Sequence, residues 1–152
     1  MKGWGVVQQA ADLEYARMKA FLAFYTDRYL LNLATLPPEK WPIACLEVLE
    51  KKGMKTALNG LRQAINDCVE ASFHFDHVEV EKLDSELRTR GIITLSELRR
   101  RYSKGYARIK KRSKIKNETE YYLIRNVLED PTEKTHEERE LLEKMISDYE
   151  GA

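Results

Sequence analysis

Large apolar residues recur every three or four positions along much of the chain, which is the period of one face of an α-helix. Between about residues 7 and 34 there is no Gly or Pro, which predicts one long helix, or two with a bend near Thr26. Leu36-Pro37-Pro38 ends this element, because proline cannot continue the helical hydrogen bonds. Its apolar stripe comprises Leu13, Met18, Phe21, Leu22, Tyr25, Tyr29 and Leu33.

Two further helices are predicted between residues 42 and 69. Pro42 suits the first turn of a short helix that runs to Lys52, and Gly53 suits its left-handed exit. The next apolar stripe comprises Met54, Leu58, Leu61, Ile65, Cys68 and Val69. Gly60 lies inside this second helix, where it either costs about 1 kcal/mol relative to Ala or marks a close helix crossing.

Four later helix starts are marked by the spacing of a capping box, in which a polar residue precedes Glu by three positions. The pairs are Asp76 with Glu79, Thr94 with Glu97, Asn117 with Glu120, and Thr135 with Glu138. They predict helices over about residues 77–90, 94–113, 118–129 and 135–149. Just before the first of them, Phe73, Phe75 and Val78 alternate, which permits a short extended piece, although a bent helix or loop is favoured.

The fold class that follows from these elements is all-α, as a helical bundle of about six to seven helices. The 152 residues suffice for one ordinary domain or for two helical subdomains. In the second case residues 1–72 form an apolar helical hairpin or bundle. Residues 73–152 then form a more charged helical unit that carries the basic segment 98–116 and an acidic C-terminal helix.

Charge is strongly segregated along a chain whose formal net charge is only +1. Residues 98–116, the basic segment, hold ten Lys or Arg and no Asp or Glu, whereas residues 117–152 hold 4 basic and 11 acidic residues, a net charge of −7. A basic surface attracts phosphates, anionic lipids or acidic proteins. One competing expectation is that the acidic tail docks on the segment and neutralises it. Another is that the cations form a solvated face without a partner, with Tyr102 and Tyr106 serving only as core. The cations are Arg99, Arg100, Arg101, Lys104, Arg108, Lys110, Lys111, Arg112, Lys114 and Lys116.

The basic segment permits two helical arrangements. One continuous helix over residues 94–113 places an apolar stripe on one side and leaves the cations to cover the rest. The stripe comprises Leu95, Leu98, Tyr102, Tyr106 and Ile109. A break at Ser103-Lys104-Gly105 gives instead two short helices with the outline of a helix-turn-helix. The second helix then offers Tyr106, Arg108, Lys110, Lys111 and Arg112 to a groove.

Candidate chemistry outside the basic segment is sparse. Glu70, His74 and His77 would share one side of a helix that continued past residue 71, in a spacing that suits a metal ion or a general base. The alternative is that Asp76 caps a helix there and the histidines make surface hydrogen bonds. The sequence contains no phosphate-binding glycine loop, no nucleophile elbow and no CxxC pair, so neither catalytic activity nor a cofactor is predicted. Cys45 and Cys68 are expected to be reduced.

The leading prediction is a non-enzymatic protein that binds nucleic acid through the basic amphipathic segment, as a small regulator would. Its Lys and Arg side chains would supply affinity, and Tyr102 or Tyr106 would position the helix or stack on bases. The alternative is a protein-interaction module of the inhibitor, immunity or antitoxin type, which docks its basic face on an acidic partner. A homo-oligomer is compatible with both. Without an apolar run of about 20 residues, the expected location is cytoplasmic, with no membrane partner.

Overall fold

The structure, a computed structural model, describes residues 2–29 and 35–151. Over these residues the chain forms eight α-helices, two short 3-10 helices and no strand, which confirms the all-α prediction. The chain divides into two compact units, Met1–Cys68 (unit 1) and Val69–Ala152 (unit 2), each described below by itself. The subdomain boundary placed at residue 72 stays a prediction.

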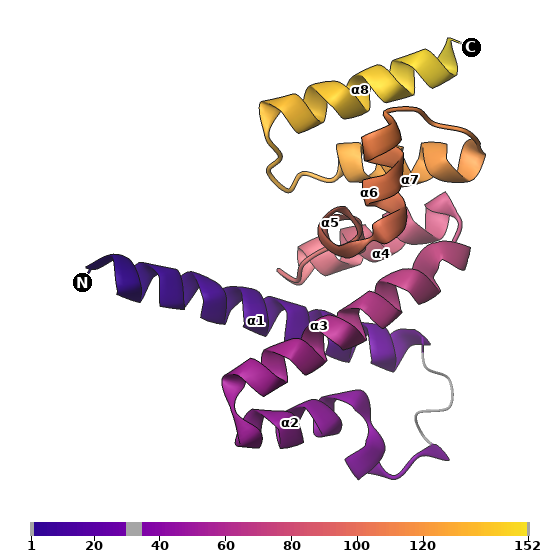
Figure 1. The fold of residues 1–152 in the computed structure, drawn as a ribbon. Helices are drawn as coiled ribbons and strands as arrows, with labels where there is room; N and C mark the ends of the chain where they lie inside the picture. The colour runs from indigo at the N-terminus through magenta and orange to yellow at the C-terminus, as the bar shows by residue number, and fades with distance from the viewer. Residues whose placement is uncertain (1, 30–34, 152) are drawn as a thin grey trace. The chain divides into compact units, whose positions relative to one another are not determined.

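Unit 1 holds three consecutive helices, which Figure 1 shows in indigo to magenta. They are α1 (Lys2–Tyr29), α2 (Pro42–Lys52) and α3 (Met54–Ala71), the last of which ends in unit 2. A short 3-10 helix, η2 (Pro38–Lys40), precedes α2. Proline opens α2 as predicted, and Gly53 ends it with φ 143°, a conformation that L-residues rarely adopt.

The predicted apolar stripe of α1 is buried along only part of its length. Met18, Phe21, Leu22 and Tyr25 are buried, whereas Leu13 is 62% exposed, contrary to the prediction. The physical reason is that the N-terminal part of α1 extends past α2, so it has no helix of unit 1 to cover it (Figure 1). Leu33 lies outside the described residues.

Polar and close contacts join the helices of unit 1. Glu50 of α2 accepts hydrogen bonds from Tyr15 Oη at 2.6 Å and from Lys19 Nζ at 3.0 Å, both on α1. At Gly60 a Cβ atom would overlap the end of the Leu49 side chain, so the missing side chain leaves room for Leu49 against α3. The two roles predicted for Gly60 stay predictions.

Unit 2 contains five further helices, and all four predicted caps are present. They are α4 (His77–Thr89), α5 (Leu95–Tyr102), α6 (Lys104–Arg112), α7 (Glu118–Glu129) and α8 (His136–Glu150). The side chains of Asp76, Thr94, Asn117 and Thr135 each accept a hydrogen bond from the backbone N–H three residues later, at 2.9 to 3.2 Å. Each bond satisfies an N–H that the helix itself leaves without a partner.

The continuous helix predicted over residues 94–113 is wrong, and the alternative break near Ser103 is confirmed. Ser103 has an extended backbone, with φ −72° and ψ 121°, and its Oγ accepts a hydrogen bond from Tyr106 N at 3.0 Å. Serine ends α5 and caps α6 because its hydroxyl replaces a helical backbone acceptor. The extra break explains why eight helices form where about six to seven were predicted.

The core of unit 2 gathers around α7, which contacts α4, α5, α6 and α8. Ile124 and Val127 of α7 are fully or almost fully buried. Tyr106 and Ile109 of α6 and Leu142 and Met145 of α8 join the same apolar cluster. Figure 1 shows α6 crossing α7. Tyr106 and Ile109 on one side of α6 are buried in the core, whereas Lys104, Arg108 and Lys111 on the opposite side are exposed.

Candidate nucleic-acid interface

Five cations of the basic segment are exposed on α6 or directly after it. Lys104, Arg108 and Lys111 follow one another at spacings of four and three residues, which places them on one side of α6, opposite the buried Tyr106 and Ile109. In the part of the chain that the structure describes, none of the five side chains forms an ion pair. We call this group the open cations: Lys104, Arg108, Lys111, Lys114 and Lys116.

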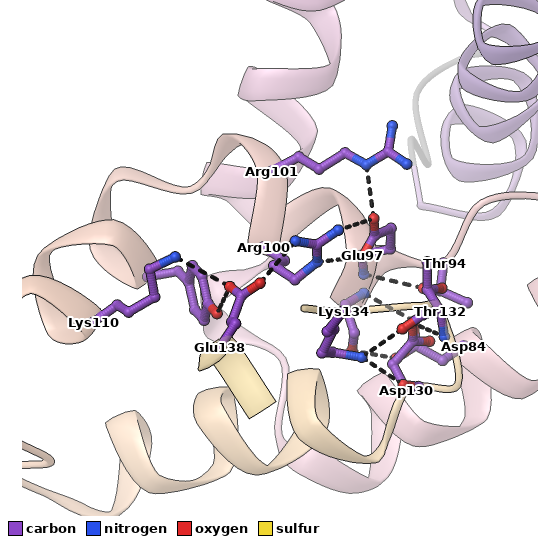
Figure 2. A network of polar contacts seen from close by, with 12 residues as sticks. Asp84, Thr94, Glu97, Arg100, Arg101, Lys110, Asp130, Thr132, Lys134 and Glu138 are labelled. Carbon is purple, nitrogen blue, oxygen red and sulfur yellow. Dashed lines mark hydrogen bonds and ion pairs between the residues drawn. The ribbon is translucent and has the colours of Figure 1, made fainter. Parts of the chain in front are cut away.

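Arg100 and Arg101 are held by a buried carboxylate at the start of α5. Glu97 is 1% exposed and accepts hydrogen bonds from Nε and Nη2 of Arg100, both at 2.7 Å, and from Nε of Arg101 at 2.7 Å (Figure 2). The paired Glu97 and the two hydrogen bonds to its oxygens raise the pKa of Arg100 further above its ordinary value. These two cations therefore stabilise the fold through charge-assisted hydrogen bonds within the chain.

A second carboxylate, Glu138 in the first turn of α8, reaches back to the basic segment. It accepts hydrogen bonds from Tyr106 Oη at 2.7 Å, Arg100 Nη1 at 3.0 Å and Lys110 Nζ at 3.2 Å (Figure 2). Burial disfavours its charged form, but the bonds from Tyr106 and Lys110 outweigh that effect and lower the pKa of Glu138. The acidic tail thus neutralises part of the segment, through Glu138 and through Glu120 of α7, which pairs with Arg112.

The two remaining cations are also engaged within unit 2. Arg112 pairs with Glu120 of α7, and its Nε donates to the Lys114 carbonyl at 3.1 Å. Arg99 is buried, donates from Nη2 to the Ser72 carbonyl at 2.8 Å, and lies over the Phe73 ring at 5.1 Å. Arg99 and Arg112 therefore fix the positions of neighbouring segments.

The eleven residues predicted for the binding site separate into three groups. The open cations face outward, whereas Arg99, Arg100, Arg101, Lys110 and Arg112 make internal contacts. Tyr106 is 1% exposed, so its ring positions α6 and is not accessible for stacking on a base. Burial and the hydrogen bond to Glu138 raise the pKa of its hydroxyl, which stays protonated.

Glu97, Glu120 and Glu138 hold cations of the basic segment, although the sequence predicted only helix-capping roles for them. All three occupy the third position of a helix whose N-cap was predicted. Their backbone N–H groups complete the caps, and their carboxylates hold cations of the basic segment. The capping-box spacing was thus the signal in the sequence that could have found them.

A polar network at the connection between α7 and α8 positions the start of α8. Asp130 is 3% exposed, accepts a hydrogen bond from Thr132 N at 3.2 Å and pairs with Arg88 Nη1 at 3.3 Å. Lys134 Nζ donates to the carbonyls of Asp130 and Thr132 at 2.7 and 2.9 Å (Figure 2). These contacts fix the connection between α7 and α8, and with it the position of Glu138.

Asp84 is a buried carboxylate of the same network, and its pKa is unusual. It is 4% exposed and accepts hydrogen bonds from the backbone N of Ser96, at 3.2 Å, and from the Ser96 hydroxyl. Burial raises the pKa of Asp84 from 3.8 to about 6, and nearby Asp130 adds to the rise. The bonds from Ser96 and the charge of Arg99 act in the opposite direction.

Asp84→Asn is expected to remove a decline of stability between about pH 4 and pH 6. Because folded Asp84 binds its proton more tightly than the unfolded chain does, its contribution to stability falls as the pH rises through that window. The free energy of unfolding of the variant minus that of the wild type should therefore grow by on the order of 2 kcal/mol from pH 4 to pH 7. Urea unfolding at both pH values measures it, and a pH-independent difference would contradict the expectation.

The weak metal candidate Glu70, His74 and His77 is not assembled. The helix does not continue past residue 71: α3 ends at Ala71, a 3-10 helix (Ser72–His74) follows, and α4 begins at His77. The His77 ring stacks on Tyr122, with centroids 3.9 Å apart. Across residues 2–29 and 35–151, no three His, Cys, Asp or Glu side chains are grouped to hold a metal ion.

Two further features of the chain are its cysteine thiols and the hydrophobicity of its helices. Cys45 and Cys68 are both free thiols, as predicted, and burial raises the pKa of Cys68 to about 12. None of the helices in the described ranges combines the length and the apolar character needed to cross a bilayer. Comparisons of the chain with protein-family models, with curated proteins and with solved structures find no match.

Proposed function

We propose that the protein binds nucleic acid, chiefly through contacts between the open cations and phosphate groups. The observation that carries the proposal is the outward side of α6, where Lys104, Arg108 and Lys111 stand together without an acidic neighbour on their own helix. Phosphates dominate the affinity of most proteins for nucleic acids, and clustered Lys and Arg side chains are the groups that bind them.

The internal ion pairs support this interpretation of the basic segment. Half of its ten cations are held inside unit 2 by Ser72 or by the glutamates at positions 97, 120 and 138. These glutamates do not pair with the open cations, which remain exposed. Like charges on adjacent turns of a helix repel one another by a few tenths of a kcal/mol per pair, a cost that an anionic partner removes.

The anchoring of α6 to the core also supports this function. Ser103 caps its first turn, Tyr106 and Ile109 anchor its inner side, and Ser113 ends it with φ 60°. Because its backbone is already helical, α6 does not lose backbone entropy on binding phosphates, whereas a flexible basic arm would have to be ordered first.

Binding of a labelled DNA duplex, followed by fluorescence anisotropy over a series of salt concentrations, tests the proposal. Three to five phosphate contacts predict a slope of log K against log salt of about −3 to −4.5. An absence of binding to duplex and single-stranded DNA and RNA at low salt would overturn the proposal and leave an acidic protein partner as the alternative. A salt-independent affinity would also contradict it, because contacts with phosphates release counterions.

A further inference from the structure

We propose, on the basis of the function above, that the ligand is double-stranded DNA in its B form and that α6 enters the major groove. The shape of the cationic face is the first reason. A helix of nine residues is about 13 Å long, and Lys104 and Lys111 are about 10 Å apart along its axis. The major groove of B-form DNA is about 12 Å wide and admits an α-helix, from which long Lys and Arg side chains can extend to the phosphates that flank the groove.

A small residue lies at one edge of this face. Ala107 is exposed and is about 60° around the helix axis from Lys104. Its methyl group leaves that edge of α6 free to come close to the base edges. Alanine is also one of the apolar residues that contact the thymine methyl group in the major groove.

The aromatic residues argue against a single strand as the ligand. Over residues 95–116, all of which the structure describes, Tyr102 and Tyr106 are the only aromatics. Tyr106 is buried and donates its hydroxyl proton to Glu138, and Tyr102 is half-buried on α5. Sites for single strands rely on exposed aromatic rings on which bases stack, and the face of α6 offers none within that range.

Cations beyond the helix extend the same surface. Lys114 and Lys116 follow α6 directly, are exposed, and flank the buried Ile115 that anchors the connection to the core. Such side chains are long enough to reach phosphates beside the groove. Other helices that lie in the major groove are held by contacts of this kind with the DNA backbone. The positive charge of this face also attracts the negatively charged duplex.

Four probes of equal length and sequence test the inference with the full chain: plain B-form DNA, the same duplex with a bulky neutral group on C5 of its pyrimidines, the RNA duplex, and single-stranded DNA. The C5 groups fill the major groove without changing the charge, and the RNA duplex has a deep, narrow major groove. Plain DNA should bind at least about tenfold more tightly than each of the other three.

Each outcome separates the inference from the proposed function. Equal affinity for the plain and the C5-blocked duplex, or for the DNA and the RNA duplex, would overturn groove entry and leave binding through phosphates intact. Binding of the single strand as tight as that of the plain duplex would overturn the choice of ligand. If none of the four probes binds, the proposed function itself fails.

Discussion

Replacing Glu97 with Ala is expected to lower the free energy of unfolding by about 3 kcal/mol, one of the two largest effects predicted for a change in this chain. The carboxylate is almost completely buried and accepts three hydrogen bonds from Arg100 and Arg101. Its removal leaves those charges without their principal partner. The loss lies at the lower end for buried ion pairs, because Arg100 keeps Glu138 and the Arg101 side chain is 32% exposed.

Urea unfolding followed by circular dichroism measures this loss. Glu81→Ala is the matched control, since Glu81 is an exposed glutamate on α4 and its removal should change stability by no more than about 0.5 kcal/mol. Glu97→Gln should lie between the two variants, because the amide keeps one acceptor oxygen and loses the charge. A loss below about 1 kcal/mol for Glu97→Ala would show that the pair with Arg100 is not a significant support of the fold.

The triple substitution Lys104→Ala, Arg108→Ala and Lys111→Ala is expected to weaken binding to duplex DNA by about 100-fold or more at low salt. The three side chains are exposed, share one side of α6 and form no ion pair among the described residues. Their removal should also make the slope of log K against log salt less negative by about 2 to 3. Since the side chains are on the surface, the helix content should not change.

The control for the triple variant removes the same charge elsewhere in unit 2. Lys82→Ala, Arg139→Ala and Lys144→Ala combine three exposed cations of α4 and α8. If binding depends on the face of α6, this control should stay within about threefold of the wild type, because only the general attraction of the net charge is lost. Equal losses in the two triple variants would contradict a localised interface.

Local signals made most of the fold predictable. Prolines at positions 37, 38 and 42, and four N-cap residues with Glu three positions later, mark helix ends through contacts between near neighbours in sequence. The break at Ser103 was harder to predict, because Leu98, Tyr102, Tyr106 and Ile109 keep a helical period on both sides of it. The extended backbone of Ser103 and the hydrogen bond from Tyr106 N to its hydroxyl distinguish two helices from one.

The division of the basic segment into paired and open cations could not be predicted in the same way. Arg100 and Lys110 meet Glu138 across 38 and 28 positions of sequence, and those contacts depend on how α8 packs on α7. In the sequence, Lys110 and Lys111 are equivalent neighbours. In the fold, one is paired and half-buried and the other is exposed, because successive residues of a helix are about 100° apart around its axis.

The short length of α6 limits how much sequence this helix can recognise by itself. A helix of about 13 Å spans about four base pairs of B-form DNA, so on the proposed duplex α6 alone distinguishes at most about 256 sequences. A genome offers about a million or more competing positions. Binding to a single site in a genome would therefore require base contacts from a further surface, such as the one that a second copy of the chain would supply.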